Sequence, residues 1–263
     1  GQIKTPFAIG KFFFSTHKAR SAAIFTALFI GKYVMPKKNL VVLTGAGISA
    51  ESGISTFRDA GGLWEGHDIM QVASPQGWRK NPALVLDFYN RRRSQLHEVQ
   101  PNAAHYALAK LEQHFDVHII TQNVDDLHER AGSTKVLHLH GELFKVRSTL
   151  DPKIIKEWKG DLNIGDKCPR GSQLRPHIVW FGEDVPLISD AIELCQEADC
   201  FAIVGTSMQV YPAAGLVDYV RDDVPKYYID PNPHPIEVRL LTVIGEKATT
   251  GVQRLCEQYL KVM

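Results

Sequence analysis

Residues 40–64 have the sequence LVVLTGAGISAESGISTFRDAGGLW, in which an apolar run leads into a Gly-Ala-Gly turn and a long polar loop. A strand that ends in such a turn usually binds a phosphate, because Gly45 and Gly47 let the backbone approach a pyrophosphate beside a helix N-terminus. A dinucleotide fingerprint would have a third glycine three positions after Gly47, but Ala50 stands there and the next glycine is Gly53. The stretch predicts a buried strand and a nucleotide loop, with a plain tight turn as the alternative.

Five more short apolar runs follow along the chain, and each predicts a strand. The runs cover residues 117–125, 135–143, 200–207, 226–233 and 240–248, and amphipathic helical patterns occupy residues 81–99 and 102–115. Strands that alternate with helices predict an α/β fold with a Rossmann-like parallel sheet. Because almost every run ends in glycine or short polar residues, we expect a ligand at the carboxyl edge of that sheet.

Two stretches interrupt this alternation. Residues from about 60 to 115 are mostly helical in pattern, and residues from about 146 to 176 are polar with several prolines and glycines. We interpret both as insertions that pack together into a small lobe on one main domain, residues 35–263. Residues 1–34 precede that domain, and three interpretations stay open for them: a non-core extension, an ordered helical addition or a targeting segment.

The charge distribution argues against nucleic-acid binding. Residues 1–34 contain five basic and no acidic residues, so residues 35–263 have 25 basic and 29 acidic residues and a net charge of −4. Binding to a phosphate backbone needs clustered Lys and Arg, which this balance does not favour. The apolar run at residues 21–31 is too short to cross a bilayer, which takes about 20 apolar residues. We therefore expect neither a nucleic-acid partner nor a membrane.

The cysteine pattern predicts reduced thiols. The chain has four cysteines, at positions 168, 195, 200 and 256, and no C-x-x-C pair. So few and so irregularly spaced cysteines do not make a disulfide framework, and the cytoplasm is the compartment that they indicate.

Five motifs then occur in a fixed order: GAGISAESGISTFRDAGGLW from residue 45, TQNVDDLHERAG from 121, HLHGEL from 138, LRPHIVWFGE from 174 and GTSMQVYPAAG from 205. Together they resemble the sirtuin family of NAD-dependent protein deacylases, and most closely its bacterial class III members. The resemblance covers the chain from about residue 38 to its end, so that residues 35–263 correspond to the sirtuin catalytic domain. It implies that NAD is consumed rather than used as a hydride carrier.

The resemblance also implies which residues bind NAD. The family more often has Asn where this chain has Asp230, and a carboxylate there should accept from both ribose hydroxyls and disfavour NADP. Without the resemblance, Asn123 or Asp125 would be interpreted as a helix N-cap. The implied cofactor-binding residues are Gly45, Ala46, Gly47, Ser49, Phe57, Arg58, Gln122, Asn123, Asp125, His140, Gly205, Thr206, Ser207, Asp230 and Ala248.

The catalytic base cannot be chosen from the pattern alone. His138 and His140 stand two positions apart and would face the same side of a strand. The resemblance implies that His140 is the base, that His138 is structural, and that Asn123 positions a water molecule. In the implied reaction the acyl-lysine oxygen attacks the nicotinamide ribose and nicotinamide leaves. His140 then removes a ribose hydroxyl proton, the 2′-oxygen attacks the carbon of the alkylamidate, and water releases lysine and O-acyl-ADP-ribose.

Two segments resemble the family's substrate-binding parts. Val179, Phe181, Gly182 and Glu183 are similar to the edge that receives an acyl-lysine peptide by strand addition, although an apolar run of this kind is more often core. Tyr89 and Arg92 share one helical face and resemble the pair that binds acidic acyl groups in class III sirtuins. A guanidinium can hold a carboxylate bidentately. The alternative is a solvated basic face formed by residues 91–93.

The chain departs from the family at its structural metal. Most sirtuins carry two C-x-x-C pairs for zinc, whereas residues 145–177 contain only Cys168. A tetrahedral Cys₄ site cannot be built from one cysteine, so we expect no zinc. The small lobe should then depend on apolar packing by Ile154, Ile155, Trp158, Leu162 and Ile164.

The function that these resemblances imply is NAD-dependent lysine deacylation of proteins or peptides, with removal of acetyl as well as succinyl or malonyl groups. Two alternatives stay open, one another enzyme and the other a protein without catalytic activity. A mono-ADP-ribosyltransferase would share the first step and use another acceptor, and a non-catalytic NAD-sensing domain would share only the fold.

Overall fold

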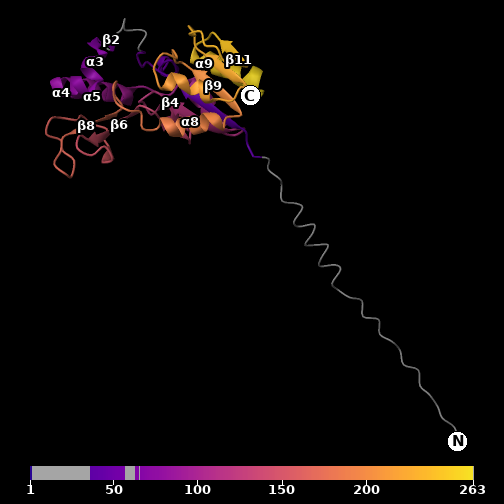
Figure 1. Cartoon of the computed structure of the whole chain (residues 1–263), viewed down its shortest axis with the longest axis horizontal. Helices are drawn as coiled ribbons and strands as arrows, with labels where there is room; N and C mark the ends of the chain where they lie inside the picture. The colour runs from indigo at the N-terminus through magenta and orange to yellow at the C-terminus, as the bar shows by residue number, and fades with distance from the viewer. Residues whose placement is uncertain (2–35, 57–62, 65, 263) are drawn as a thin grey trace. The chain divides into compact units, whose positions relative to one another are not determined.

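The large unit of the fold is built on a parallel sheet, shown at the centre of the folded part in Figure 1. The computed structural model describes residues 1, 36–56, 63–64 and 66–262. It divides the chain into two units, Gly1–Pro36 and Lys37–Met263, and everything below concerns the second. Apart from Gly1, the proposed extension lies outside the described residues, as do Phe57 and Arg58.

All six predicted strands are present in this sheet. They are β1 (Asn39–Thr44), β4 (Asp116–Thr121), β5 (Val136–His138), β9 (Cys200–Val204), β10 (Lys226–Ile229) and β11 (Leu241–Ile244). They pair in parallel in the order β11-β10-β9-β1-β4-β5. Numbered along the chain this is the 3-2-1-4-5-6 order of a Rossmann sheet, whose switch point lies between β1 and β9. The predicted fold class is confirmed.

The central strand shows why the sequence forms a covered parallel sheet. Leu40 and Val42 pack into one apolar cluster, while Val41 and Leu43 pack into a second cluster on the opposite face. A strand buried on both faces needs a continuous apolar run rather than alternation. Helices cover both faces: α6 (Ala103–Leu111) and α9 (Ala248–Arg254) one of them, and α8 (Ile188–Gln196) with the 3₁₀ helix η1 (Ala213–Tyr219) the other.

The position of α6 corrects the expected lobe boundary. The sequence analysis placed residues up to about 115 in the small lobe, yet Ala104, Leu108 and Leu111 pack on the large sheet. Asn102 caps the helix by accepting from the Ala104 backbone N–H at 3.0 Å. The first insertion therefore ends before α6. The C-terminal π-helix η2 (Leu255–Leu260) continues α9 on the same face.

The small lobe combines helices with an antiparallel sheet. Its helices are α3 (Ile69–Val72), α4 (Pro75–Lys80) and α5 (Pro82–Glu98), and its strands pair as β7-β6-β8: β7 (Ile155–Glu157), β6 (Gly141–Ser148) and β8 (Leu174–Ile178). The short strands β2 (Leu63–Trp64) and β3 (His67–Asp68) form a separate pair. In Figure 1 the labels α3 to α5, β6 and β8 gather on the side away from α9 and β11.

The core of the small lobe differs in part from the expected one. Leu162 is fully buried against Leu86, Val146, Cys168 and Leu174, and Ile154 and Trp158 pack partly against them. Two residues expected in this core are exposed instead. Ile155 is 43% exposed because β7 is a short edge strand with exposed residues throughout, and Ile164, in the loop after Leu162, is 59% exposed. Among the described helices, none has the length and apolar character to cross a membrane.

Candidate active site

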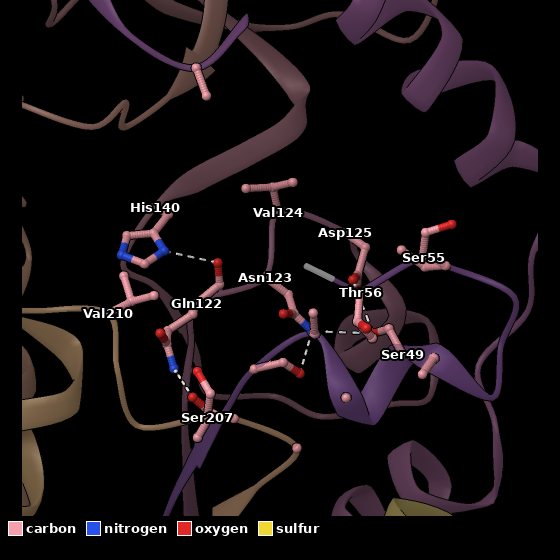
Figure 2. A pocket seen from close by; sticks show the side chains of 18 of the residues that line it. Ser49, Ser55, Thr56, Gln122, Asn123, Val124, Asp125, His140, Ser207 and Val210 are labelled. Carbon is pink, nitrogen blue, oxygen red and sulfur yellow. Dashed lines mark hydrogen bonds between the residues drawn. The ribbon is translucent and has the colours of Figure 1, made fainter. Parts of the chain in front are cut away.

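A cavity of about 630 Å³ opens at the carboxyl ends of β1, β4, β9 and β10, where the fold places a ligand. The loops after these strands form one wall. Helix α5, Ile178 at the end of β8 and residues 179–183 after it form the other. The cavity therefore lies between the large sheet and the small lobe. Figure 2 shows its polar side chains.

Glycine is required where the loops after β1 and β9 meet. The Gly47 N–H donates to the Gly205 carbonyl oxygen at 2.8 Å, and a Cβ on Gly47 would lie 2.7 Å from the Gly205 Cα atom. Gly205 itself has φ +62°, in the left-handed region that favours glycine. The helix after the turn, α2 (Gly47–Ala50), is a single turn long. Both predicted glycine loops line the cavity, together with Ala46, Thr206 and Ser207.

A buried polar network occupies the base of the cavity (Figure 2). The Asn123 side-chain amide donates to the Gly45 carbonyl oxygen and to Ser49 Oγ, each at 3.2 Å. Ser49 Oγ donates to one Asp125 carboxylate oxygen at 3.0 Å, and the Leu127 N–H donates to the other at 3.2 Å. The latter bond reaches the first residue of α7 (Leu127–Arg130), but the N-cap residue of that helix is Asp126, so neither Asn123 nor Asp125 is the N-cap. Burial raises the pKa of Asp125, although these two donors oppose the rise.

Gln122 connects the ends of two strands. Its side-chain amide donates to Thr206 Oγ1 at 3.0 Å, which joins the loop after β4 to the loop after β9 across the switch point. The Tyr228 hydroxyl in turn donates to the Thr206 carbonyl oxygen at 2.8 Å. These bonds join the loops that form the cavity floor.

His140 lies at the cavity with one ring nitrogen fixed. Its Nδ1 atom lies 3.0 Å from the Gln122 carbonyl oxygen, as the dashed line in Figure 2 shows. A carbonyl oxygen only accepts, so Nδ1 carries the proton and Nε2 keeps a lone pair. Burial lowers the pKa of His140, which keeps the ring neutral near pH 7. A neutral imidazole with a free Nε2 is suited to act as a general base.

His138 has a different environment from His140, contrary to the expectation that both face one side of a strand. Strand β5 ends at His138, and His140 follows in a turn before Gly141. The His138 ring lies 2.7 Å from Glu129 Oε1 and 3.1 Å from the Asn123 carbonyl oxygen, and it is not among the residues lining the cavity. Burial alone would lower the pKa of His138, but Glu129 reverses the shift, and the net direction is upward.

Of the two remaining predicted cofactor residues, Asp230 lines the cavity and Ala248 does not. Asp230 is buried at the end of β10, accepts from the Asn232 N–H at 2.8 Å and lines the cavity. Ala248, the first residue of α9, is also buried, but its neighbour Lys247 is the residue that lines the cavity.

Tyr89 and Arg92, the pair on α5 that is predicted to bind an acidic acyl group, are buried beside the cavity. Tyr89 is fully buried, Arg92 is 7% exposed, and both contribute to the cavity wall. The solvated basic face applies only to Arg91, which is exposed and paired with Asp87. Arg93 is 1% exposed and donates to the Leu143 carbonyl oxygen at 3.0 Å. Burial raises the pKa of Tyr89, so its phenol stays protonated.

The predicted peptide edge is a turn rather than a strand. Strand β8 ends at Ile178, and the N–H groups of Val179 and Phe181 donate to the carbonyl oxygens of His140 and Ala73. These two N–H groups already bond within the chain, so strand addition would have to use other backbone groups of the segment. Val179, Phe181 and Gly182 do line the cavity, and Phe181 is 41% exposed.

Glu183 has a structural role that the sequence did not indicate. Its carboxylate accepts from Arg147 at 2.9 Å, from Arg175 at 2.7 Å and from the Trp180 N–H at 2.9 Å. The Arg175 guanidinium also lies over the Trp180 ring, 3.3 Å from its centroid. Trp180 and Arg175 were both visible inside the LRPHIVWFGE motif, but nothing in the motif reveals these partners.

No metal-binding cluster occurs in the part of the chain that the structure describes. Among those residues, no group of three or more His, Cys, Asp or Glu side chains is placed to hold an ion. Cys168, Cys195, Cys200 and Cys256 are all free and buried.

Comparison with known proteins assigns the family. The sequence model of the Sir2 family matches residues 45–212, which include the glycine turn, the polar network and His140. The chain belongs to the Sir2 family. A Helicobacter pylori relative named NAD-dependent protein deacylase is 60% identical over 229 residues, which cover 86% of this chain and 99% of the relative.

Two solved Sir2 structures share the fold. A Sir2 homologue in complex with NAD is 40% identical, with a TM-score of 0.77 and coverage of 86% of this chain and 90% of that one. A homologue variant in complex with 2′-O-acetyl ADP ribose is 39% identical, also with a TM-score of 0.77, and the match covers 88% of this chain and 95% of the other.

Proposed function

We propose that this Sir2 protein is an NAD-dependent protein-lysine deacylase that transfers the acyl group to ADP-ribose and releases nicotinamide. The observation that carries the proposal is His140, a partly buried, neutral imidazole whose Nδ1 donates to the Gln122 carbonyl and whose Nε2 is unprotonated. The name of the Helicobacter pylori relative and the ligands of the two solved homologues support the same activity.

The cavity suits NAD in its shape and polarity. The two glycine loops bring backbone within reach of a pyrophosphate, and the buried amides and hydroxyls around Asn123 and Ser49 offer donors and acceptors to a ribose and a carboxamide. Asp230 supplies a carboxylate at the end of β10 for the hydroxyls of the second ribose. Bound NAD supplies the electrophilic ribose carbon and the leaving nicotinamide.

The residues of the chain then have defined roles. His140 accepts a ribose hydroxyl proton on Nε2. Asn123, whose amide is anchored on Gly45 and Ser49, orients the polar groups at the base of the cavity and holds the water that completes the reaction. Burial of the reacting carbon in the cavity keeps it from bulk water, which would otherwise hydrolyse NAD.

We propose acidic acyl groups, succinyl and malonyl, as substrates alongside acetyl. Arg92 and Tyr89 line the cavity on one face of α5, in a position where little solvent competes for a carboxylate. A charge-assisted hydrogen bond is stronger in such a place than at the surface. Neither residue offers anything specific to an acetyl group.

We also propose that the protein has no zinc, binds acyl-lysine peptides but neither nucleic acid nor membranes, and works in the cytoplasm. The single cysteine of the small lobe supports the first point, and the net charge of −4 over residues 35–263 the second. The four free, buried cysteines fit a reducing compartment.

One experiment tests the central proposal. The purified protein is incubated with NAD and matched acetyl-, succinyl- and malonyl-lysine peptides, and the products are identified by mass spectrometry. We expect free lysine peptide, nicotinamide and O-acyl-ADP-ribose in equal amounts. ADP-ribosylated protein without deacylated peptide would favour the ADP-ribosyltransferase instead, and unconsumed NAD would favour a sensing domain.

A further inference from the structure

Two neighbouring carbonyl groups of the loop after β4 are each bound by a histidine ring. The Gln122 carbonyl oxygen lies 3.0 Å from His140 Nδ1, and the Asn123 carbonyl oxygen lies 3.1 Å from His138 Nδ1. The carbonyl groups on either side accept from backbone N–H groups of the same segment, those of Leu139 and Leu143. The loop is therefore attached through four consecutive carbonyl groups, two of them by imidazoles.

The two partners of His138 require both of its ring nitrogens to carry a proton. Nδ1 faces the Asn123 carbonyl oxygen, which only accepts, and Nε2 lies 2.7 Å from Glu129 Oε1. An ionised carboxylate also only accepts, so the ring donates from both sides and is an imidazolium. His138 is therefore charged where His140, two positions along the chain, is neutral.

The titratable groups around the His138 ring favour its charged form. They are Glu129 and His128 on α7, Asp125 before that helix, and Glu142 and Lys145 on β6. Burial opposes the charge, but Glu129, Glu142 and the Asn123 carbonyl outweigh it and raise the pKa of His138 above its ordinary value. Burial also holds the pKa of His128 well below 6.5, so that ring is neutral near pH 7 and does not repel His138. Lys145 is paired with Glu142 at 2.7 Å.

The bond from His138 fixes one of three polar parts of Asn123. The Asn123 N–H donates to Thr121 Oγ1 at 3.0 Å, and its side-chain amide donates into the buried network at the cavity base, as Figure 2 shows. The peptide unit after Asn123 is planar, so it cannot rotate without breaking its bond to His138. Such a rotation would also move the adjacent Gln122 carbonyl oxygen, which holds His140. A charge-assisted bond is stronger than a neutral one and is suited to prevent it.

We propose that His138, held by Glu129, is a positioning residue for deacylation: it binds the Asn123 carbonyl oxygen and so fixes the loop that presents the Asn123 amide and the main-chain acceptor of His140. The inference rests on the proposed function. It gives the first histidine of the HLHGEL motif a role in the reaction that is exerted from outside the cavity.

The first test compares two substitutions of His138 with an acetyl-lysine peptide and NAD. His138→Leu fills much of the volume of the ring and removes the donor to the Asn123 carbonyl oxygen. We expect kcat to fall about ten- to a hundredfold, the effect of one hydrogen bond to a charged group, while KM for each substrate changes by less than about threefold. His138→Asn is the rescue variant, because its amide nitrogen can take the place of Nδ1 as a donor, and it should recover most of the lost kcat.

His118→Leu is the matched control, because the His118 ring is also paired with a carboxylate, that of Asp116, at the start of β4. It should leave kcat unchanged. A kcat within twofold of the unsubstituted protein in His138→Leu, or an equal loss in His138→Leu and His138→Asn, would overturn the inference while the proposed function stands. If the unsubstituted protein does not deacylate the peptide, the proposed function fails at that first measurement, and this inference fails with it.

A second measurement needs no substitution of His138 and applies if His138→Leu does not fold. The ¹⁵N resonances of the histidine rings report which nitrogens are protonated. At pH 6.5 we expect His138 to be more than half in the imidazolium form and His140 to carry its proton on Nδ1. Glu129→Gln, at a partly exposed side chain, should move the His138 titration to lower pH, and Glu98→Gln, at an exposed position of α5, should not. A neutral His138 ring at pH 6.5, or a titration that Glu129→Gln leaves in place, would overturn the inference.

Discussion

The Nδ1 atom of His140 lies 3.0 Å from the main-chain carbonyl oxygen of Gln122. This contact leaves Nε2 as the basic atom, and a variant without an imidazole has no replacement for it. We expect His140→Tyr to lower the rate of deacylation by at least about 10²-fold. The thermal midpoint should stay close to that of the unsubstituted protein. His114→Asn is the control, because His114 is exposed, and retained activity in His140→Tyr would remove His140 from the role of base.

The dependence of kcat/KM on pH should reflect the ionisation of His140. Burial lowers the pKa of His140 below its ordinary value of 6.5, and the base works only in its neutral form. Activity should therefore persist at pH 6.5 and fall only at lower pH, as the ring becomes protonated. The measurement is kcat/KM for an acetyl peptide between pH 5 and 8. An acid limb with its midpoint above 6.5 would contradict the assignment.

Acyl selectivity should depend on Arg92. We expect Arg92→Met to lower kcat/KM for succinyl-lysine at least about tenfold, since buried charged hydrogen bonds contribute about 1.5–3 kcal/mol each. Cleavage of acetyl-lysine should change far less. The matched control is Arg91→Met on the adjacent, exposed position of α5. Equal losses on both substrates would show that Arg92 does not bind the acyl group.

The contact between the two glycine loops should tolerate no side chain. A Cβ on Gly47 would lie 2.7 Å from the Gly205 Cα atom and 2.8 Å from its carbonyl oxygen. We expect Gly47→Ala to destabilise the fold by about 1–3 kcal/mol and to weaken NAD binding. Urea unfolding and calorimetric titration with NAD would measure both effects. Gly160→Ala is the control, because no atom lies within 4 Å of a Cβ there, and an equal change in both variants would refute the prediction.

A buried histidine pair should make the protein acid-labile. Burial lowers the pKa of His105 to about 4 and holds that of His128, whose ring lies 4.9 Å away, well below 6.5. The unfolded chain then binds protons that the folded chain rejects, so the free energy of unfolding falls as the pH drops from about 6.5 towards 4. For His105 alone the loss reaches about 3 kcal/mol.

Urea unfolding at pH 7 and at pH 5 tests this prediction. His105→Gln should show a smaller loss between the two pH values than the unsubstituted protein, whereas His114→Asn should show the same loss. The His138–Glu129 pair acts in the opposite sense, because the raised pKa of His138 stabilises the fold at low pH. An equal pH dependence in His105→Gln and in the unsubstituted protein would show that His105 is not responsible.

The small lobe should be stable without metal. We expect a chelator to leave the thermal midpoint unchanged and elemental analysis to find less than one zinc per chain. Packing around the fully buried Leu162 should carry the stability instead, and Leu162→Ala should cost about 2–5 kcal/mol. Ile164→Ala, at an exposed position, is the control. One zinc per chain would refute the prediction.

The strands could be predicted because each is a local apolar run, and the central strands β1 and β9 are buried on both faces. Helix α6 shows the limit of such patterns: its apolar face indicates that it packs on something, but its partner, the large sheet, is a property of the whole fold. The same limit explains Ile155, which is apolar in sequence and exposed because β7 lies at an edge.

The motifs predicted which residues line the site. They did not predict how those residues are oriented, because the path of the backbone sets the orientation. The two histidines were expected on one face, but the chain turns after His138, and Gly141 follows with φ +83° where a Cβ would lie 2.0 Å from the His177 carbonyl oxygen. The bond between Trp180 and Tyr89 spans two distant segments, and no spacing in the sequence indicates it.

The partner that sets the tautomer of His140 belongs to the main chain. Every amino acid at position 122 would present the same carbonyl oxygen, so a substitution there removes the side-chain bond to Thr206 but not the acceptor for Nδ1. A mutation of Gln122 therefore leaves the tautomer of the His140 imidazole unchanged. The protonation state of the base is thus set by the path of the backbone rather than by the side chain at position 122.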